Sequence, residues 1–178
     1  MKKTVFGLII IFNILAIFYL VLPTPTLPDL KDAIKSDLPG DTTQLKNVSG
    51  YFTNLSRTEV INFYKANYNG PFRIQLNHPP EKAREIILNT IQTYYFEEFV
   101  LPFKGSIFIN GYDWQNDVFT KPEKRLANKL IYKGVEYQTK VTIKVIPTSI
   151  PQRLIGFFGT ELSLIVVFFL YQNILKRK

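Results

Sequence analysis

The stretch VEYQTKVTIKV, residues 135–145, carries the strongest secondary-structure signal in this chain of 178 residues. Apolar and polar side chains alternate along it, which is the period of a half-buried β-strand. Lys133 and Gly134, just before it, suit a tight turn. We therefore expect one long strand, paired through that turn with residues 129–132, whose single buried face is formed by Val135, Tyr137, Thr139, Val141, Ile143 and Val145.

A helix is predicted further upstream, in LSRTEVINFYKANYNGP at residues 55–71. Ser56 and Glu59 have the Ser-x-x-Glu spacing with which two side chains satisfy free amides at a helix start. Gly70 tolerates the left-handed geometry of a helix end, and Pro71 cannot continue a helix. The apolar residues between these signals fall on one face, so this helix should pack on a sheet.

The next segments predict a strand and a second helix. FRIQLN, residues 72–77, alternates apolar and polar side chains as a half-buried strand does. In residues 78–99, two prolines suit a first helical turn, and the only histidine, His78, is interpreted as a cap at the helix start. The apolar stripe expected on this second helix consists of Ala83, Ile86, Ile87, Ile91 and Tyr94 or Tyr95.

Asn110 and Gly111 favour the two left-handed positions of a hairpin turn, with a plain loop as the alternative. Two helices and about four strands, each with one apolar face, predict the α+β class: a small two-layer domain over residues 50–147, with both helices on one side of an antiparallel sheet. Residues 23–49 hold four prolines and mixed charge. They predict a partly extended tether with room for one helical turn over residues 29–37.

Both ends of the chain are apolar enough to predict transmembrane helices. Residues 4–22 carry no charge, and residues 154–175 carry only Glu161. Each is long enough to cross a hydrocarbon core of roughly 30 Å. For residues 1–22 we expect an uncleaved anchor rather than a cleaved signal peptide, because the apolar stretch is long and runs into prolines.

Positive charges at the two ends predict the orientation in the cell membrane. Lys2 and Lys3 precede the first span, and the basic tail 176–178 follows the second, within a C-terminal segment of residues 148–178. Basic residues stay on the cytoplasmic side of a bilayer. Both termini are therefore expected in the cytoplasm and the central domain outside it, with the lipid bilayer as the first partner.

Glu161 is the unusual residue of the second span. An ionised acid near the centre of a span costs on the order of 2.5 to 3.5 kcal/mol, so it usually pairs or carries function; a tolerated, protonated acid is the alternative. Asn13 is expected at a similar depth, within hydrogen-bonding reach. A second side of this helix carries a strip of small residues, which would admit a second copy or another membrane subunit: Gly156, Gly159, Thr160 and Ser163.

The amino-acid composition excludes some classes of function. Without cysteine, thiol catalysis and thiolate metal sites are excluded. The net charge of +8 falls to +4 outside the chain ends, and the densest basic run, residues 121–129, contains an acid. That run is interpreted as a solvated loop rather than a nucleic-acid footprint. No catalytic, metal-binding or cofactor motif is recognised, so an enzyme is the least expected reading.

The aromatic stretch TYYFEEFVLPF, residues 93–103, is interpreted either as core or as a partner or ligand surface. The residues that such a surface would present are Tyr94, Tyr95, Phe99 and Phe103. The leading expectation is a membrane-anchored interaction or scaffold module in a membrane complex. The alternative is an extracytoplasmic ligand-sensing or binding domain.

Overall fold

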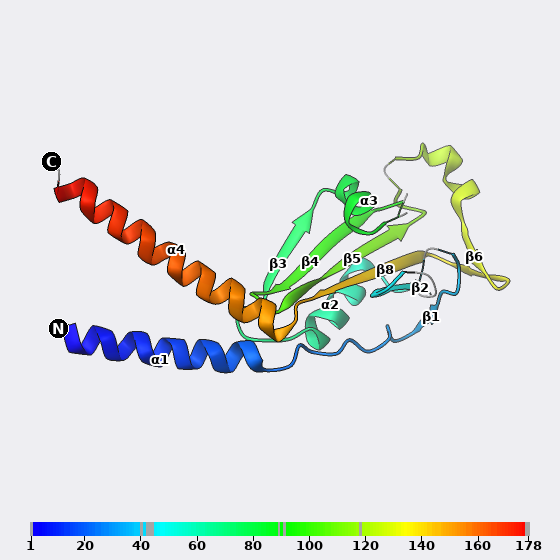
Figure 1. Ribbon diagram of the computed structural model, residues 1–178. Coiled ribbons are helices and arrows are strands. Elements are labelled where there is room, and N and C mark those ends of the chain that lie inside the picture. Colours follow the sequence, from blue (N-terminus) through cyan, green and yellow to red (C-terminus); the bar gives the residue numbers. More distant parts are fainter. Residues whose placement is uncertain are drawn as a thin grey trace. The chain divides into compact units, whose positions relative to one another are not determined.

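The computed structural model describes residues 2–39, 41, 45–88, 90, 92–117 and 119–176 (Figure 1). The chain divides into two compact units. One comprises the chain ends, Met1–Thr24 and Pro147–Lys178, and the other comprises Pro25–Ile146.

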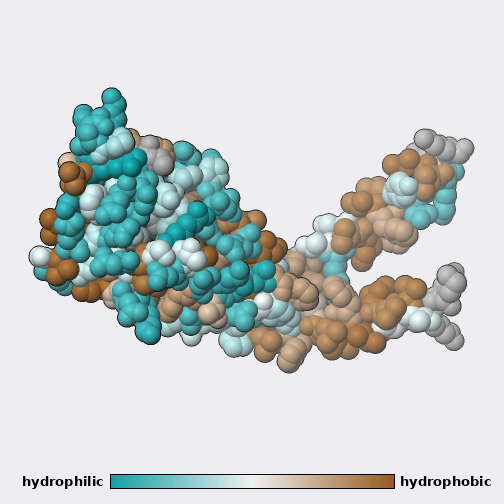
Figure 2. All heavy atoms as spheres, turned by 180° about the vertical axis from the view of Figure 1, so that it is seen from behind, coloured by the Kyte–Doolittle hydropathy of each residue, from teal (hydrophilic) through white to brown (hydrophobic). Residues whose placement is uncertain are grey.

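The unit of the chain ends is built from two long helices, α1 (Lys2–Val21) and α4 (Ile150–Lys176). Both are long and apolar enough to cross a membrane. Only 6% of the residues in the apolar window of each helix are buried, whereas a core helix of a soluble protein is mostly buried. Figure 2 shows both helices covered mainly by apolar side chains, while the visible face of the domain is largely hydrophilic.

The other unit is an α+β domain, which confirms the predicted class, but its antiparallel sheet has six strands rather than about four. The strands lie in the order β1-β2-β8-β5-β4-β3 (Figure 1). Their bounds are β1 Ala33–Lys35, β2 Val48–Thr53, β3 Ile74–His78, β4 Tyr95–Leu101, β5 Gly105–Asp113 and β8 Thr139–Pro147. The remaining elements are α2 (Arg57–Asn67), η1 (Pro80–Lys82), α3 (Ala83–Ile86), η2 (Pro122–Asn128) and the separate hairpin of β6 (Leu130–Tyr132) and β7 (Val135–Tyr137).

The predicted turn at Lys133 and Gly134 is confirmed, with φ angles of 53° and 80° that join β6 to β7. The long strand is interrupted at Gln138, whose backbone N–H donates to the Asn54 side chain at 3.0 Å. After the interruption, β8 continues between β2 and β5. Tyr137 consequently packs with Phe52 in one cluster while later β8 residues pack in another, so the single buried face predicted for 135–145 is wrong.

Helix α2 forms as its capping signals predict, and both hydrogen bonds of the Ser56 and Glu59 capping box are present. It covers one face of the sheet. Val60, Ile61 and Tyr64 of the helix are buried there against strand residues of the main core: Tyr51, Tyr95, Phe99, Leu101, Ile107, Ile109, Val141 and Ile143.

The second long helix predicted for residues 78–99 is wrong. Only the short η1 and α3 form, and residues 95–101 are strand β4, paired with β3 on one side and β5 on the other. Aromatic and β-branched residues favour a pleated surface, and pairing on both edges outweighs the helical apolar period. Ile91 of the predicted stripe lies outside the described residues.

The two helical segments cover opposite faces of the sheet, so the predicted arrangement with both on one side is also wrong. Successive strand residues point to opposite faces. Tyr95 belongs to the core under α2, whereas its neighbour Phe96 packs with Phe108 against Ala83 and Ile87.

Asn110 and Gly111 do not form a turn, because β5 runs straight through them. The turn between β4 and β5 lies instead at residues 102–104. Gly111 pairs with Tyr95, and a Cβ on this glycine would lie 2.0 Å from the tyrosine ring. The glycine therefore permits a close packing contact rather than a tight turn.

The tether predicted for residues 23–49 is packed into the domain from Pro25 onward. Strand β1 lies inside it and pairs with β2, in place of the expected helical turn. Leu30 is 3% exposed and belongs to the main core, with Leu27 packed against it. The domain therefore begins near residue 25, not residue 50.

Buried tyrosines make the domain sensitive to alkali. Burial raises the pKa of Tyr51 to about 12 and also raises the pKa values of Tyr64 and Tyr95 above the ordinary 10. Between pH 10 and 12 the unfolded chain loses phenol protons that the folded domain keeps, so the unfolded state binds fewer protons. We predict that the free energy of unfolding falls as pH rises through this range, measured by urea unfolding followed through the fluorescence of the single tryptophan, Trp114.

Two tyrosine variants give that prediction a matched comparison. The Tyr64 hydroxyl is buried without a partner among the described residues, whereas the Tyr51 hydroxyl donates to Asp29 at 2.7 Å. At pH 7, Tyr64→Phe should leave stability unchanged or raise it, and Tyr51→Phe should cost about 1 kcal/mol. Unfolding that is insensitive to pH between 10 and 12 in the unaltered protein would contradict the prediction.

Candidate functional site

Arg153 joins the two long helices at one end. Its Nη1 donates to the carbonyl oxygens of Leu20 at 3.0 Å and Leu22 at 2.9 Å. Its Nη2 donates to Thr24 Oγ1 at 2.6 Å, and its Nε donates to the carbonyl oxygen of Thr148 at 3.0 Å. The residue is only 5% exposed. The end of α1 and the start of α4 are thus tied by one side chain, which makes the helices an antiparallel pair.

The acceptors explain how this cation is buried. All four hydrogen-bonding acceptors are carbonyl or hydroxyl oxygens, and none is a carboxylate. The last carbonyls of a helix lack intrahelical donors and form the negative end of the helix dipole, which favours a cation there. The planar guanidinium can reach several of these oxygens at once. Sequence reasoning missed Arg153, although a lone arginine at the start of a long apolar stretch is a visible signal.

The contact between the helices continues one turn beyond the arginine. Phe157 is 7% exposed, and its ring centroid lies 6.3 Å from that of Phe12. Residues four apart lie on one side of a helix, so Arg153, Phe157 and Glu161 share the stripe of α4 that faces α1. Glu161 therefore lies beyond the observed contact, on the same stripe.

The hydrogen bond expected between Asn13 and Glu161 does not form in the described structure. The Asn13 amide donates to the carbonyl oxygen of Ile9 in its own helix at 3.1 Å. Phe12, its neighbour, lies against Phe157, one turn before Glu161. In the structure, Asn13 and Glu161 therefore differ in position along the helix pair by about one turn, whereas the sequence predicts a similar depth.

The small-residue strip of α4 lies on a different side of the helix from Phe157. The hydroxyls of Thr160 and Ser163 donate to the carbonyl oxygens of Gly156 and Gly159, each at 2.8 Å. A Cβ on Gly159 would meet no atom within 4 Å. Helix α1 therefore does not cover this strip, and the polar atoms of the strip are satisfied within α4.

The aromatic residues 94–103 do not form one surface. Tyr95 and Phe99 are 2% and 0% exposed and belong to the core under α2. Tyr94 is half-buried, and Phe103 is exposed in the turn between β4 and β5. The interpretation of this stretch as core is therefore correct for two of the four residues, Tyr95 and Phe99.

A pocket of about 330 Å³ lies beside the two tyrosines. Two of its polar side chains, Arg57 and His78, are already engaged by the protein, whereas the buried hydroxyl of Tyr95 has no hydrogen-bond partner among the described residues. Both Nε and Nη2 of Arg57 donate to Glu97, at 3.0 and 2.7 Å, and His78 Nε2 lies 2.8 Å from Glu98. The pocket is lined by Arg57, Asn77, His78, Pro79, Pro80, Tyr94 and Tyr95.

These contacts correct the role assigned to His78. It ends strand β3 and bonds Glu98 across the sheet, and the short helix that follows has no side-chain cap. The adjacent Glu97 and Glu98 point to opposite faces of β4, because successive strand residues alternate. They cannot share one substrate as an acid pair.

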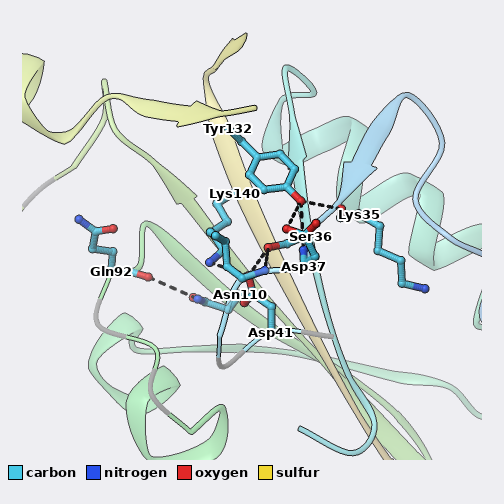
Figure 3. Close-up of polar contacts among 9 residues, drawn as sticks. Lys35, Ser36, Asp37, Asp41, Gln92, Asn110, Tyr132 and Lys140 are labelled. Atoms are coloured by element: carbon cyan, nitrogen blue, oxygen red, sulfur yellow. Dashed lines mark hydrogen bonds and ion pairs between the residues drawn. The ribbon is translucent and has the colours of Figure 1, made fainter. Parts of the chain in front are cut away.

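A buried polar cluster ties the N-terminal segment of the domain to β8 (Figure 3). Asp41 Oδ2 accepts from Ser36 Oγ at 2.5 Å and from Lys140 Nζ at 3.0 Å. Beside it, the Tyr132 hydroxyl donates to Asp37 at 2.6 Å, which lowers the pKa of that carboxyl. Ser36 and Asp41 are only 2% and 4% exposed, so this cluster stabilises the fold and offers no access to a substrate.

No protein-family model matches this chain, and neither a curated protein nor a solved structure is detectably similar to it. Within the described ranges, no group of three or more His, Asp or Glu side chains is placed to hold a metal ion.

We predict that Arg153→Met separates the helices at this end. Four oxygen atoms lose their donor, which should destabilise the helix pair by roughly 2 to 4 kcal/mol. The measurement is disulfide formation between Phe12→Cys and Phe157→Cys in the full-length protein, which has no other cysteine. The yield should fall severalfold with Arg153→Met and should not fall with Arg84→Met, the same change at an exposed site. Equal yields in both variants would contradict the role assigned to Arg153.

Proposed function

We propose that the chain is a two-pass protein of the cell membrane, with both termini in the cytoplasm and the α+β domain outside it. The exposure of nearly all residues in the apolar windows of α1 and α4 supports this placement, because contact with lipid removes that apolar surface from water. Lys2, Lys3 and the basic residues 176–178 at the two ends support the cytoplasmic side for both termini.

The contacts of Arg153 support an anchor that is retained. Removal of residues 1–22 as a signal peptide would take away the carbonyl oxygens of Leu20 and Leu22. The guanidinium would then keep only some of its partners at the start of an apolar helix, where an unsatisfied charge is costly. A permanent helical hairpin is the state in which Arg153 is satisfied.

In this membrane the protein serves as an interaction module of a larger complex. The observation that carries this proposal is the small-residue strip of α4, in which Gly156 and Gly159 are exposed and a Cβ on Gly159 would meet no atom within 4 Å. Small residues let another helix backbone approach closely in lipid, where packing rather than the hydrophobic effect drives association. Glu161 lies on the stripe of α4 that faces α1, on the other side of the helix from the small-residue strip. The two sides of α4 therefore serve two different contacts.

The occupant of the strip is a second copy of this chain or another membrane subunit. Ligand sensing by the domain is the alternative function, and an enzyme remains the least supported reading. The pocket beside Tyr94 does not favour the alternative, because two of its lining side chains, Arg57 and His78, are already paired with Glu97 and Glu98.

The test substitutes leucine for Gly159. The new side chain has free space within this chain, so the hairpin should persist while association through the strip is blocked. We expect about tenfold weaker association, which corresponds to roughly 1.4 kcal/mol. The measurement is the mass and composition of the assembly extracted in mild detergent. Glu161→Leu should also weaken the assembly, because an acid within a span usually pairs with a neighbouring protein group.

Gly7→Leu is the matched control. Gly7 lies on α1, and a Cβ there also meets no atom within 4 Å. The control should leave the assembly intact. If Gly159→Leu and Gly7→Leu behave alike, the strip has no role in association and the proposal fails.

A further inference from the structure

Two phenylalanines hold an unusual conformation at the surface of the domain. Phe72 is 77% exposed and Phe103 is 41% exposed. Both have positive φ angles, 62° and 61°. Bulky residues rarely adopt this left-handed geometry, which glycine or asparagine would adopt without strain. Strain of this kind at exposed positions is a reason to look for a function.

Both phenylalanines lie at the same end of the sheet. Ile74 near the start of β3 pairs with Val100 near the end of β4, and the turn containing Phe103 follows directly. A Cβ on Gly70, two residues before Phe72, would lie 2.9 Å from the Leu101 side chain. The loop before β3 and the turn after β4 are therefore neighbours, and Ile74 adds a third exposed apolar side chain there.

The chain leaves the domain for α4 at this same end. Strand β8 lies beside β5 and runs antiparallel to it, so β8 ends where β5 begins, next to the turn of Phe103 (Figure 1). The last residue of β8 is Pro147 and α4 starts at Ile150. Three chain steps span at most about 11 Å. The polar layer on each side of a bilayer is roughly 5 to 8 Å deep, so this end of the sheet stays within reach of it.

The charges around the two phenylalanines suit an anionic surface. Residues 60–80 and 99–112 contain no Asp or Glu, and their Lys and Arg residues are Lys65, Arg73 and Lys104. Lys104 is only 5% exposed, so Lys65 and Arg73 carry the accessible positive charge. Lys65 is exposed on α2, and Arg73 donates to the carbonyl oxygens of Lys65 and Tyr68. Basic residues beside apolar ones favour the boundary between lipid headgroups and acyl chains.

We propose that Phe72 and Phe103 insert into the outer surface of the bilayer, so that the domain rests on lipid through this end of its sheet. The proposal rests on the proposed function, because it requires α4 to cross a membrane. It adds a third attachment to the two helices and fixes which surfaces of the domain face away from the membrane. In the proposed contact, lipid covers the exposed part of both phenylalanines.

Spin labels in the cysteine-free chain test this contact. Single-cysteine variants Phe72→Cys and Phe103→Cys, labelled with a nitroxide, are reconstituted at full length in phosphatidylcholine and phosphatidylglycerol vesicles. Leu162→Cys on α4 and Leu126→Cys on η2, both exposed in the structure, are the lipid and water references. The ratio of oxygen to nickel-chelate accessibility at 72 and 103 should exceed that at 126 severalfold and approach that at 162.

Each other outcome would contradict either the lipid contact or the proposed function. A lipid-like label at 162 with water-like labels at 72 and 103 contradicts the contact and leaves the proposed function standing. Labels at 72 and 103 shielded from both reagents mean that protein, not lipid, covers this end. A water-like label at 162 contradicts the proposed function itself.

One further variant keeps both phenylalanines in place. A label at the exposed Asn69, three residues before Phe72, should show the lipid-like ratio in the unaltered background. The ratio should fall severalfold when Phe72→Ser and Phe103→Ser are added. An unchanged ratio would contradict the role of the rings.

Discussion

The helical unit depends on the burial of one positive charge at the end of a helix. Arg153 is enclosed at the junction of α1 and α4 with oxygen atoms of Leu20, Leu22, Thr24 and Thr148 as its partners. A guanidinium without a carboxylate is tolerated there because the free carbonyls of α1 supply partial negative charge. The same bonds satisfy carbonyls that would otherwise face an apolar environment. The same hydrogen bonds thus satisfy the buried cation and the free helix carbonyls. They also hold together two helices that share few other contacts.

The domain shows which parts of a fold are encoded locally. The capping box of Ser56 and Glu59 and the turn at Lys133 and Gly134 act within a few residues, so the sequence predicts them correctly. Strand β4 depends on pairing with β3 and β5, which are remote in the chain, and its residues also fit a helical period. Asn110 and Gly111 are typical of a turn, but Gly111 lies in a strand, where its missing side chain leaves room for the ring of Tyr95.

The candidate site likewise has some features that are visible in the sequence and others that only the fold brings together. The apolar helices and Glu161 are visible in the sequence, because composition alone identifies a long uncharged stretch and its exception. Three of the four partners of Arg153, namely Leu20, Leu22 and Thr24, come from more than 120 residues earlier, and no local pattern predicts them. The sequence leaves open whether Tyr95 and Phe99 are core or surface, and only the sheet shows that they are core. Phe72 alternates as a buried strand residue should, but it precedes an edge strand and remains exposed.

The placement of the domain opposite both termini is the central claim, and single-cysteine labelling tests it most directly. Because the chain has no cysteine, Leu126→Cys in the domain and Lys3→Cys or Lys176→Cys at the ends can each be labelled alone with a membrane-impermeant maleimide. In intact cells, the account predicts labelling at 126 and none at 3 or 176 until the membrane is permeabilised. Labelling of either terminus in intact cells, or protection of 126, would contradict it.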